Sequence, residues 1–276
     1  MRGLLYFLIC FPLLPCISCG NSSSKYITLA TTTSTRDTGL LDVLLPAFKQ
    51  KYGIEVRVVA VGTGQALEIG RRGDADVILT HDPAGEERFI TDQFGISRQE
   101  VMSNDFVLAG PKDDPAGVKS ATSGVDAFRR VAEKQAVFIS RGDESGTHQK
   151  EKTTWQQAQI EPDGNWYIRA GQGMGAVLRM ADEKRGYTLT DRGTYLALRQ
   201  KLQLEPLFTG DPAWINQYSV LLINPKVQTH IQHSYARQFA EFLVSPEAQQ
   251  IITDYGREQY GEPLFRPRLA SKQGGT

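Results

Sequence analysis

The sequence predicts an α/β protein built as two lobes, and three observations indicate this. Short apolar runs typical of strands alternate with amphipathic runs typical of helices. The alternation starts again after a polar, proline-marked stretch at residues 110–115, and turns rich in hydroxyl groups or glycine follow several strands. Strands and helices in regular succession are typical of helices packed on a mostly parallel sheet. Ligands of such folds bind where strands end and helices begin.

The first part of the chain repeats a unit of strand and helix. Residues 26–30 predict a strand, and residues 39–52 predict a helix with apolar side chains along one stripe. Pro83 suits the first turn of a later helix, where a backbone N–H has no intrahelical partner. In chain order, strands are expected at 26–30, 54–61, 76–80 and 106–109, and helices at 39–52, 66–72 and 83–93.

The pattern restarts beyond residue 110 and then returns. An apolar strand at 217–223 leads back towards the first part, so we expect one lobe from residues 25–109 and 218–276 and the other from residues 110–217. In the second part, strands are expected at 136–139, 166–168 and around Tyr187 and Leu189, and helices at 146–158, 175–183 and 193–200; helices at 230–243 and 246–255 close the chain.

The overall charge favours no large charged partner. The 276 residues include 31 Lys and Arg and 31 Asp and Glu, so the formal net charge is zero. Nucleic acids and anionic membranes favour a basic surface, so we expect no nucleic-acid partner. A small anion can still bind where local dipoles supply the attraction.

The N-terminus predicts export. Arg2, an apolar run at residues 4–14 and small residues before Gly20 are typical of a secretory signal over residues 1–19, too short to span a membrane. Two interpretations stay open: Cys19 becomes the lipidated first residue of a lipoprotein, or the signal is cleaved and no lipid is added. All three cysteines lie in this segment, so we expect no disulfide, thiolate metal site or cysteine nucleophile in the mature chain.

Two polar segments follow strands of the first lobe. Residues 31–35 are five consecutive hydroxyl residues ahead of a helix, and helix capping needs only one. Hydroxyl donors and the free N–H groups of a helix start form an anion site without a formal cation. Thr63, between Gly62 and Gly64, has the same position in the next unit, where glycine lets a ligand approach the backbone.

The third polar segment, residues 140–148, opens a helix of the second lobe. Ser145, Thr147 and the N–H of Gly146 can donate towards one point, and Arg141 has a planar fork of donors that matches oxyanions. The alternative without a binding role is a surface ion pair between Arg141 and a neighbouring carboxylate. The density of donors at one helix start favours a binding site.

Residues 31–35, 79–83 and 140–148 together carry a resemblance. The sequence resembles the tungstate-binding periplasmic components of ABC transporters, a branch of the type II periplasmic binding proteins. That resemblance implies a two-lobed clamshell that delivers tungstate, or molybdate, to permease and ATPase subunits, with no cofactor, no bare metal ion, no catalysis and a monomeric chain outside the cytoplasm. Membrane contact would come only through a lipid on Cys19. The binding residues that it implies are Thr33, Ser34, Thr63, Arg141, Ser145, Gly146 and Thr147.

Other functions stay open on the residues alone. A phosphate or sulfate carrier would share the donors, and monohydrogen phosphate would also want an acceptor such as Asp82 or Asp143. A hydrolase would need Ser34 or Ser145 beside His81 or His148, with a further group to orient the base, and the sequence identifies no such group. An anion sensor without a transporter is the third alternative.

Overall fold

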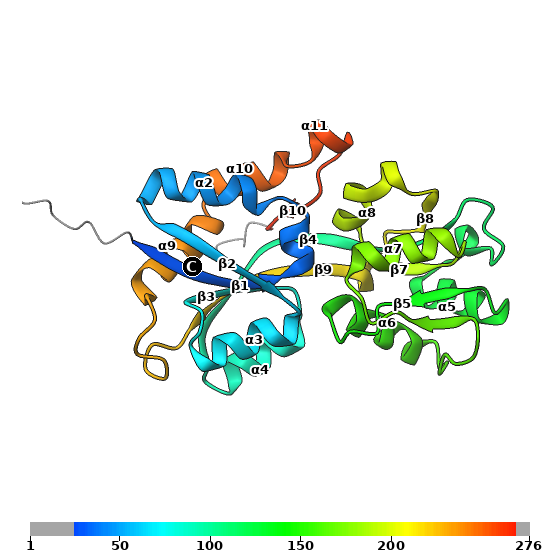
Figure 1. Ribbon diagram of the computed structural model, residues 1–276, viewed down its shortest axis with the longest axis horizontal. Coiled ribbons are helices and arrows are strands. Elements are labelled where there is room, and N and C mark those ends of the chain that lie inside the picture. Colours follow the sequence, from blue (N-terminus) through cyan, green and yellow to red (C-terminus); the bar gives the residue numbers. More distant parts are fainter. Residues whose placement is uncertain (1–24, 269–276) are drawn as a thin grey trace, which may run out of the picture.

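The computed structural model describes residues 25–268, which form two lobes side by side (Figure 1). The predicted signal at residues 1–19, with Cys19, lies outside the described residues. No helix within residues 25–268 is long and apolar enough to cross a membrane.

The first lobe, on the left of Figure 1, is a sheet covered on both faces by helices. β1 pairs in parallel with β2 and β3, and β9 then adds to β3 in the antiparallel sense. Helices α2, α9 and α10 lie on one side of the sheet, and α3 and α4 lie on the other. The elements are β1 (Tyr26–Thr32), α1 (Thr33–Asp37), α2 (Leu41–Tyr52), β2 (Glu55–Val61), α3 (Thr63–Arg72), β3 (Val77–Thr80), α4 (Pro83–Thr91), β9 (Ile215–Ile223), α9 (His233–Leu243), α10 (Pro246–Asp254), α11 (Arg257–Tyr260) and β10 (Arg266–Pro267).

The second lobe, on the right of Figure 1, surrounds the far end of β4. β7 and β8 pair with β4 there, and β5 and β6 form a separate parallel pair. The elements are β4 (Gly95–Pro111), η1 (Val118–Ser120), α5 (Gly124–Glu133), β5 (Phe138–Ser140), α6 (Gly146–Gln157), β6 (Tyr167–Arg169), α7 (Met174–Glu183), β7 (Thr188–Asp191), α8 (Arg192–Leu198), η2 (Arg199–Lys201), β8 (Leu204–Phe208) and η3 (Pro212–Trp214).

The strands β4 and β9 connect the lobes. They pair antiparallel from Gly95 opposite Ile223 to Asp105 opposite Ile215, and β4 continues into the second lobe to Pro111. The pairing places Asn104 opposite Asn216 at the crossing. The lobe limits 25–109, 110–217 and 218–276 stay predictions; β4 stops pairing with β9 at Asp105 and pairs with β7 from Phe106.

The sheet type is wrong, one strand is longer than expected, and several elements were not predicted. The sheet is mixed rather than mostly parallel, because every described strand that pairs with β4 or β9 runs antiparallel to it. The strand expected at 106–109 is the end of the 17-residue β4, whose first half is partly exposed and so lacks a continuous apolar pattern. No expectation covered α1, α5, β8, α11 and β10.

Apolar packing extends through both lobes. One buried cluster contains residues of α2, β1 and α9 and continues into α7 of the second lobe, so a single core spans the junction. A second cluster in the second lobe surrounds Phe128, Trp155 and Trp214. Phe48 of α2 is fully buried, with its ring centroid 5.0 Å from that of Phe239 and 5.4 Å from that of Phe242.

Truncation of Phe48 should therefore destabilise the first lobe. We expect Phe48→Ala to lower the free energy of unfolding by about 3–5 kcal/mol, because it leaves a cavity among aromatic rings. Val43, on the same helix but 43% exposed, is the matched control, and Val43→Ala should change stability by no more than about 0.5 kcal/mol. Urea unfolding measures both, and similar losses in the two variants would contradict this packing.

Candidate functional site

The hydroxyl run begins at the end of β1. Thr32 caps α1, since its hydroxyl accepts from the N–H of Thr35 at 3.1 Å, and Thr31 donates to a carbonyl of β3 at 2.8 Å. The hydroxyls of Thr32 and Thr35 are also 2.6 Å apart. Thr31, Thr32 and Thr35 thus stabilise the turn between β1 and α1. Thr33 and Ser34 instead line a pocket of about 600 Å³ between the lobes.

Ser34 contacts a histidine that follows β3. The Oγ of Ser34 lies 3.3 Å from Nε2 of His81 and 3.0 Å from Oγ1 of Thr32. The other ring nitrogen of His81, Nδ1, lies 3.0 Å from Oδ1 of Asn216 on β9. The first lobe thus provides a buried polar chain that runs from α1 to the connecting strand.

The second junction lies between β2 and α3. Gly62 has an extended backbone at the N-cap of α3, and Thr63 is the first helical residue. The side chain of Thr63 is buried, and its hydroxyl has no hydrogen-bond partner among the described residues. Gly64, its neighbour, lines a pocket of about 720 Å³ together with Gly146 of the other lobe.

The third junction follows β5 and is the jaw of the second lobe, residues 141–147. Gly142 has φ +59°, a left-handed conformation that glycine adopts without strain. Ser145 caps α6 by accepting from the N–H of His148 at 3.4 Å. The hydroxyl of Thr147 is buried and has no partner within residues 25–268.

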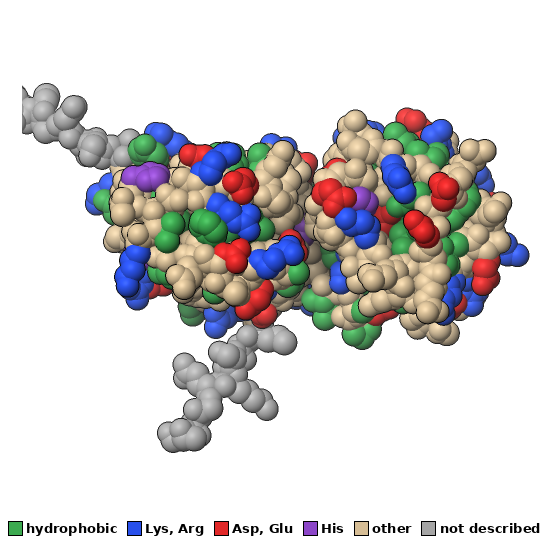
Figure 2. All heavy atoms as spheres, turned by 90° about the horizontal axis from the view of Figure 1, so that it is seen from below, with side chains coloured by type: hydrophobic (Ala, Val, Ile, Leu, Met, Phe, Trp, Pro, Cys, Tyr) green, Lys and Arg blue, Asp and Glu red, His purple; other side chains and the backbone are tan. Residues whose placement is uncertain are grey.

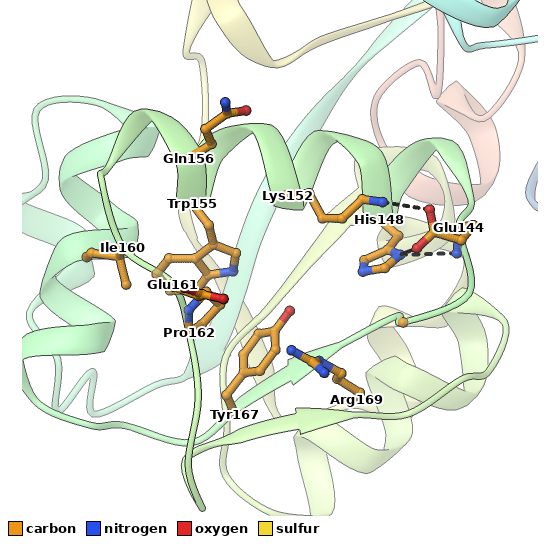
Figure 3. A pocket seen from close by; sticks show the side chains of 11 residues that line it. Glu144, His148, Lys152, Trp155, Gln156, Ile160, Glu161, Pro162, Tyr167 and Arg169 are labelled. Carbon is orange, nitrogen blue, oxygen red and sulfur yellow. Dashed lines mark hydrogen bonds and ion pairs between the residues drawn. The ribbon is translucent and has the colours of Figure 1, made fainter.

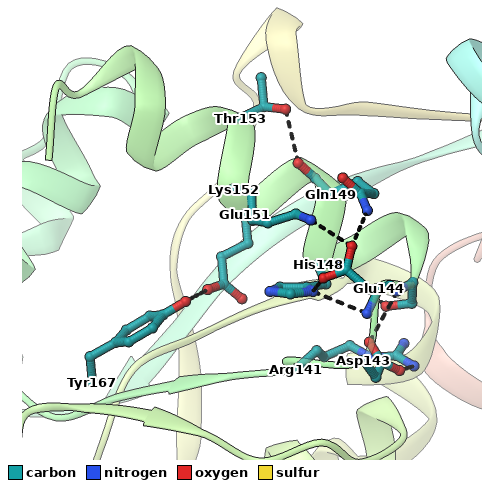
Figure 4. Close-up of polar contacts among 10 residues, drawn as sticks. Arg141, Asp143, Glu144, His148, Gln149, Glu151, Lys152, Thr153 and Tyr167 are labelled. Atoms are coloured by element: carbon teal, nitrogen blue, oxygen red, sulfur yellow. Dashed lines mark hydrogen bonds and ion pairs between the residues drawn. The ribbon is translucent and has the colours of Figure 1, made fainter. Parts of the chain in front are cut away.

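Arg141 is buried rather than on the surface. It is 4% exposed and forms an ion pair with Asp143, whose other oxygen accepts from the N–H of Ser145 at 3.2 Å (Figure 4). These contacts hold the pKa of Asp143 below its usual range despite its partial burial. The Nε of Arg141 has no partner in the described chain, so the guanidinium keeps a free, buried donor.

The three segments between a strand and a helix lie close together where the lobes meet. A Cβ added to Gly146 would lie 2.9 Å from Cε1 of His81, so the second jaw is in contact with the first lobe. Figure 2 shows the groove between the lobes from below. Gly173 and Met174 also line the pocket beside Ser34, so the start of α7 faces the boundary between the lobes.

Three of the predicted binding residues have a buried donor without a hydrogen-bond partner among the described residues. Thr63 Oγ1, Arg141 Nε and Thr147 Oγ1 are among the few such atoms in the described chain. Each unsatisfied buried group costs about 1–3 kcal/mol, so a fold tolerates several together only where another acceptor can recover the cost. Hydroxyl, guanidinium and backbone donors fit an anion that accepts hydrogen bonds.

Two carboxylates, those of Asp82 and Asp143, could accept a proton from a ligand. Asp143 is used by Arg141 and Ser145. Asp82, at the start of α4, lines the same pocket of about 720 Å³ as Gly64 and Gly146, and its carboxylate lies against Gly85 of that helix. Neither has a described contact with Ser34 or Thr63.

Behind the jaw lies a buried acid. Glu151, on α6, accepts from the hydroxyl of Tyr167 at 2.6 Å (Figure 4). Burial raises the pKa of Glu151 to about 7, and the Tyr167 hydroxyl, Ser140 and the backbone N–H of Arg141 oppose this rise. Glu151 therefore supports the backbone from which Arg141 projects.

A separate pocket of about 500 Å³ lies beside α6 and β6 (Figure 3). Its lining includes Trp155, Tyr167 and Arg169, and all of its lining residues belong to the second lobe. His148 stands at its edge, with Nδ1 3.1 Å from the N–H of Glu144, and burial lowers the pKa of His148. This pocket lies outside the junction between the lobes.

Several polar residues at the junction were missed from the sequence. Asn104 and Asn216 meet across β4 and β9, with Nδ2 of Asn216 2.9 Å from Oδ1 of Asn104. Asp191 caps α8 and lies buried near His81. His81 could be selected from the sequence, because it belongs to the segment 79–83 directly after a strand. The two asparagines could not, because they become neighbours only through the strand register.

The fold and the junction define a class of protein. A family model described as a PBP superfamily domain matches residues 20–247. The chain therefore belongs to the PBP superfamily, the periplasmic binding proteins.

Individual relatives narrow the comparison. The chain is 49% identical to the tungstate-binding protein TupA of Peptoclostridium acidaminophilum over 246 residues, which cover 88% of this chain and 86% of the relative. A solved structure described as the tungstate ABC transporter from Geobacter sulfurreducens is 49% identical, with a TM-score of 0.78 and coverage of 83% of this chain and 98% of that chain. The solved TupA of Desulfovibrio alaskensis G20 is 43% identical, with a TM-score of 0.78 and coverage of 89% and 99%.

Stability should depend on the proton of Glu151. Its pKa is raised from 4.5 to about 7, so the folded chain keeps the proton that the unfolded chain loses. Its contribution is therefore greatest below pH 4.5 and is lost as pH rises to about 7, a change of up to about 3 kcal/mol. Glu151→Gln keeps the acceptor for Tyr167 and should lack this loss. Urea unfolding from pH 5 to 8 compares the two proteins, and parallel pH profiles would contradict the raised pKa.

Proposed function

We propose that this chain is an extracytoplasmic solute-binding protein that captures tungstate, with molybdate as the related second ligand, for an ABC importer. The observation that carries the proposal is the set of buried donors without partners, Thr63 Oγ1, Arg141 Nε and Thr147 Oγ1, at the junction of the lobes. The names of the relatives at 49% and 43% identity support tungstate as the ligand. The binding residues are Thr33, Ser34, Thr63, Arg141, Ser145, Gly146 and Thr147.

The protonation of the ligand supports tungstate over phosphate. Tungstate and molybdate are dianions that only accept hydrogen bonds, whereas monohydrogen phosphate also needs an acceptor. Asp143 already accepts from Arg141 and Ser145, and Asp82 lies over its own helix. A site composed of donors therefore suits the acceptor-only dianions.

The chain is a binding protein and not an enzyme, as its relatives are transport proteins. Ser34, His81 and Asn216 do form a hydrogen-bonded series, which supplies the orienting group that the hydrolase alternative lacked. The same contacts serve binding, since they hold a hydroxyl in a buried place at the junction. Ser145, the other candidate nucleophile, is used as the cap of α6.

Capture requires the lobes to close on the anion. The contact of Gly146 with His81 and the hydrogen bond from Arg199 to the carbonyl of Tyr260, 2.8 Å, join the lobes on two sides. The pairing of β4 with β9 provides the hinge between them. The ligand selects the closed form because only that form brings donors of both lobes together.

The cellular context follows from this role. The relatives support a periplasmic protein or one on the outer face of the membrane. The permease and ATPase subunits of the importer are its partners, and the chain acts as a monomer. Lipidation at Cys19 would add an anchor.

Removal of the arginine tests the ligand and the site together. Calorimetric titration should find binding of tungstate and molybdate, and phosphate should not bind. Arg141→Ala should weaken tungstate binding by about 2–4 kcal/mol, about 30- to 1000-fold in Kd, because a charged donor is lost from a desolvated site. Arg185→Ala is the matched control, since Arg185 is an exposed arginine of the same lobe that pairs with Asp113. Tight phosphate binding without tungstate binding, or equal Kd values for the two variants, would refute the assignment.

A methyl group at Gly146 tests closure. Gly146→Ala places Cβ 2.9 Å from Cε1 of His81 and 3.3 Å from its carbonyl oxygen, so the lobes should not close fully. We expect tungstate affinity to fall by at least about tenfold, a loss of about 1.4 kcal/mol. Gly64→Ala, where Cβ meets nothing within 4 Å, should retain most of the affinity. Small-angle scattering with saturating tungstate should find a larger radius for Gly146→Ala alone.

A further inference from the structure

The side chain of His81 contacts the first lobe, the jaw of the second lobe and the connecting strand β9. It is 5% exposed, and its ring lies between Ser34 of the first lobe and Gly146 of the second. Its Nδ1 contacts Asn216, and its ring packs on Tyr218, with the centroids 4.8 Å apart. A change in the protonation of this ring therefore affects its contacts with Ser34, Gly146 and Asn216.

The neighbours of His81 fix its neutral tautomer. Asn104 directs its Oδ1 towards Asn216, and its Nδ2 has no hydrogen-bond partner among the described residues. Oδ1 of Asn104 then accepts from Nδ2 of Asn216 at 2.9 Å.

The orientation of the Asn216 amide determines the tautomer of His81. With its Nδ2 donated to Asn104, and 3.1 Å from the Tyr218 hydroxyl, Asn216 presents Oδ1 to the ring. Nδ1 of His81 must then carry a hydrogen, and neutral His81 has a bare Nε2. That bare nitrogen accepts from the hydroxyl of Ser34.

This arrangement uses the single hydroxyl hydrogen of Ser34. A hydroxyl has one hydrogen, so Ser34 cannot donate to His81 and to a bound oxyanion at the same time. An anion that only accepts would face a lone pair on Ser34 Oγ. If Nε2 of His81 also carries a hydrogen, it donates to Ser34, and Ser34 is free to donate to the anion.

We propose that His81 takes up one proton when the oxyanion binds and thereby converts Ser34 into a donor to that anion. The proton comes from solvent and bonds to Nε2, the hydroxyl of Ser34 rotates, and the contact of Nδ1 with Asn216 is kept. His81 is a positioning residue, which acts on the ligand through Ser34. The inference rests on the proposed function, because it requires an oxyanion at this junction.

The charges around the ring determine the direction of the pH dependence. Burial lowers the pKa of His81, and Arg141 adds to this, whereas Asp191, Asp82 and the contact with Asn216 raise it. The lowered pKa keeps His81 neutral near pH 7 before binding, and a dianion nearby favours the charged ring. Anion affinity should therefore rise as pH falls, by at most about tenfold per pH unit.

Calorimetry tests the proton directly. Tungstate titrations at pH 7 in two buffers with different heats of ionisation give the number of protons taken up. We expect about 0.5–1 proton per tungstate for the natural chain and none for His81→Asn. His148→Gln, which alters the other histidine near the jaw, should keep the uptake. Tungstate binding without uptake, or uptake that is lost in His148→Gln and kept in His81→Asn, would overturn the inference while the binding function stands.

Nitrogen NMR provides a second measurement that a merely structural role would not change. The chain has four histidines, so their imidazole signals can be assigned by substitution. In the anion-free protein His81 should carry its hydrogen on Nδ1, and both nitrogens should be protonated after tungstate is added. A neutral ring with hydrogen on Nε2, or an unchanged spectrum with tungstate bound, would overturn the inference. If none of tungstate, molybdate, sulfate and phosphate binds, the proposed function fails and this inference fails with it.

Discussion

The antiparallel pairing of β4 with β9 is the constraint on which the rest of the structure depends. Both strands belong to the sheet of the first lobe, and β4 continues into the second lobe, where it pairs with β7 and β8. Their register sets Asn104 opposite Asn216. Because the polar chain to His81 starts from that pair, the geometry of the hinge and the chemistry of the junction are determined by the same hydrogen bonds.

The proposed site would attract its anion without a net positive charge on the protein. The chain has a formal charge of zero, and the ion pair with Asp143 partly neutralises Arg141, the buried cation. Most of the attraction must therefore come from hydroxyl and backbone donors at the starts of α1, α3 and α6. Such donors are effective because the site is buried, where a hydrogen bond to a charged group is worth more than in water.

Local pattern predicted most of the strand–helix units and the three polar junctions, because those features depend on residues close in sequence. It predicted a mostly parallel sheet, which is wrong because β4 and β9 are joined through long-range pairing that leaves no local signal. The role of Asn216 was invisible for the same reason. Ser34 could be selected from its hydroxyl run, but its contact with His81 depends on how β1 and β3 lie in the sheet.

The double crossing by β4 and β9 has a wider consequence. Two strands that are hydrogen-bonded to each other resist sliding apart, so the closure proposed above would be a change in the angle between the lobes. A partner that touches both lobes from outside can sense that angle, although it never touches what lies between them. The angle between the lobes would thus tell the partner whether an anion is bound. One anion would have to be distinguished from another at the binding site before the lobes close.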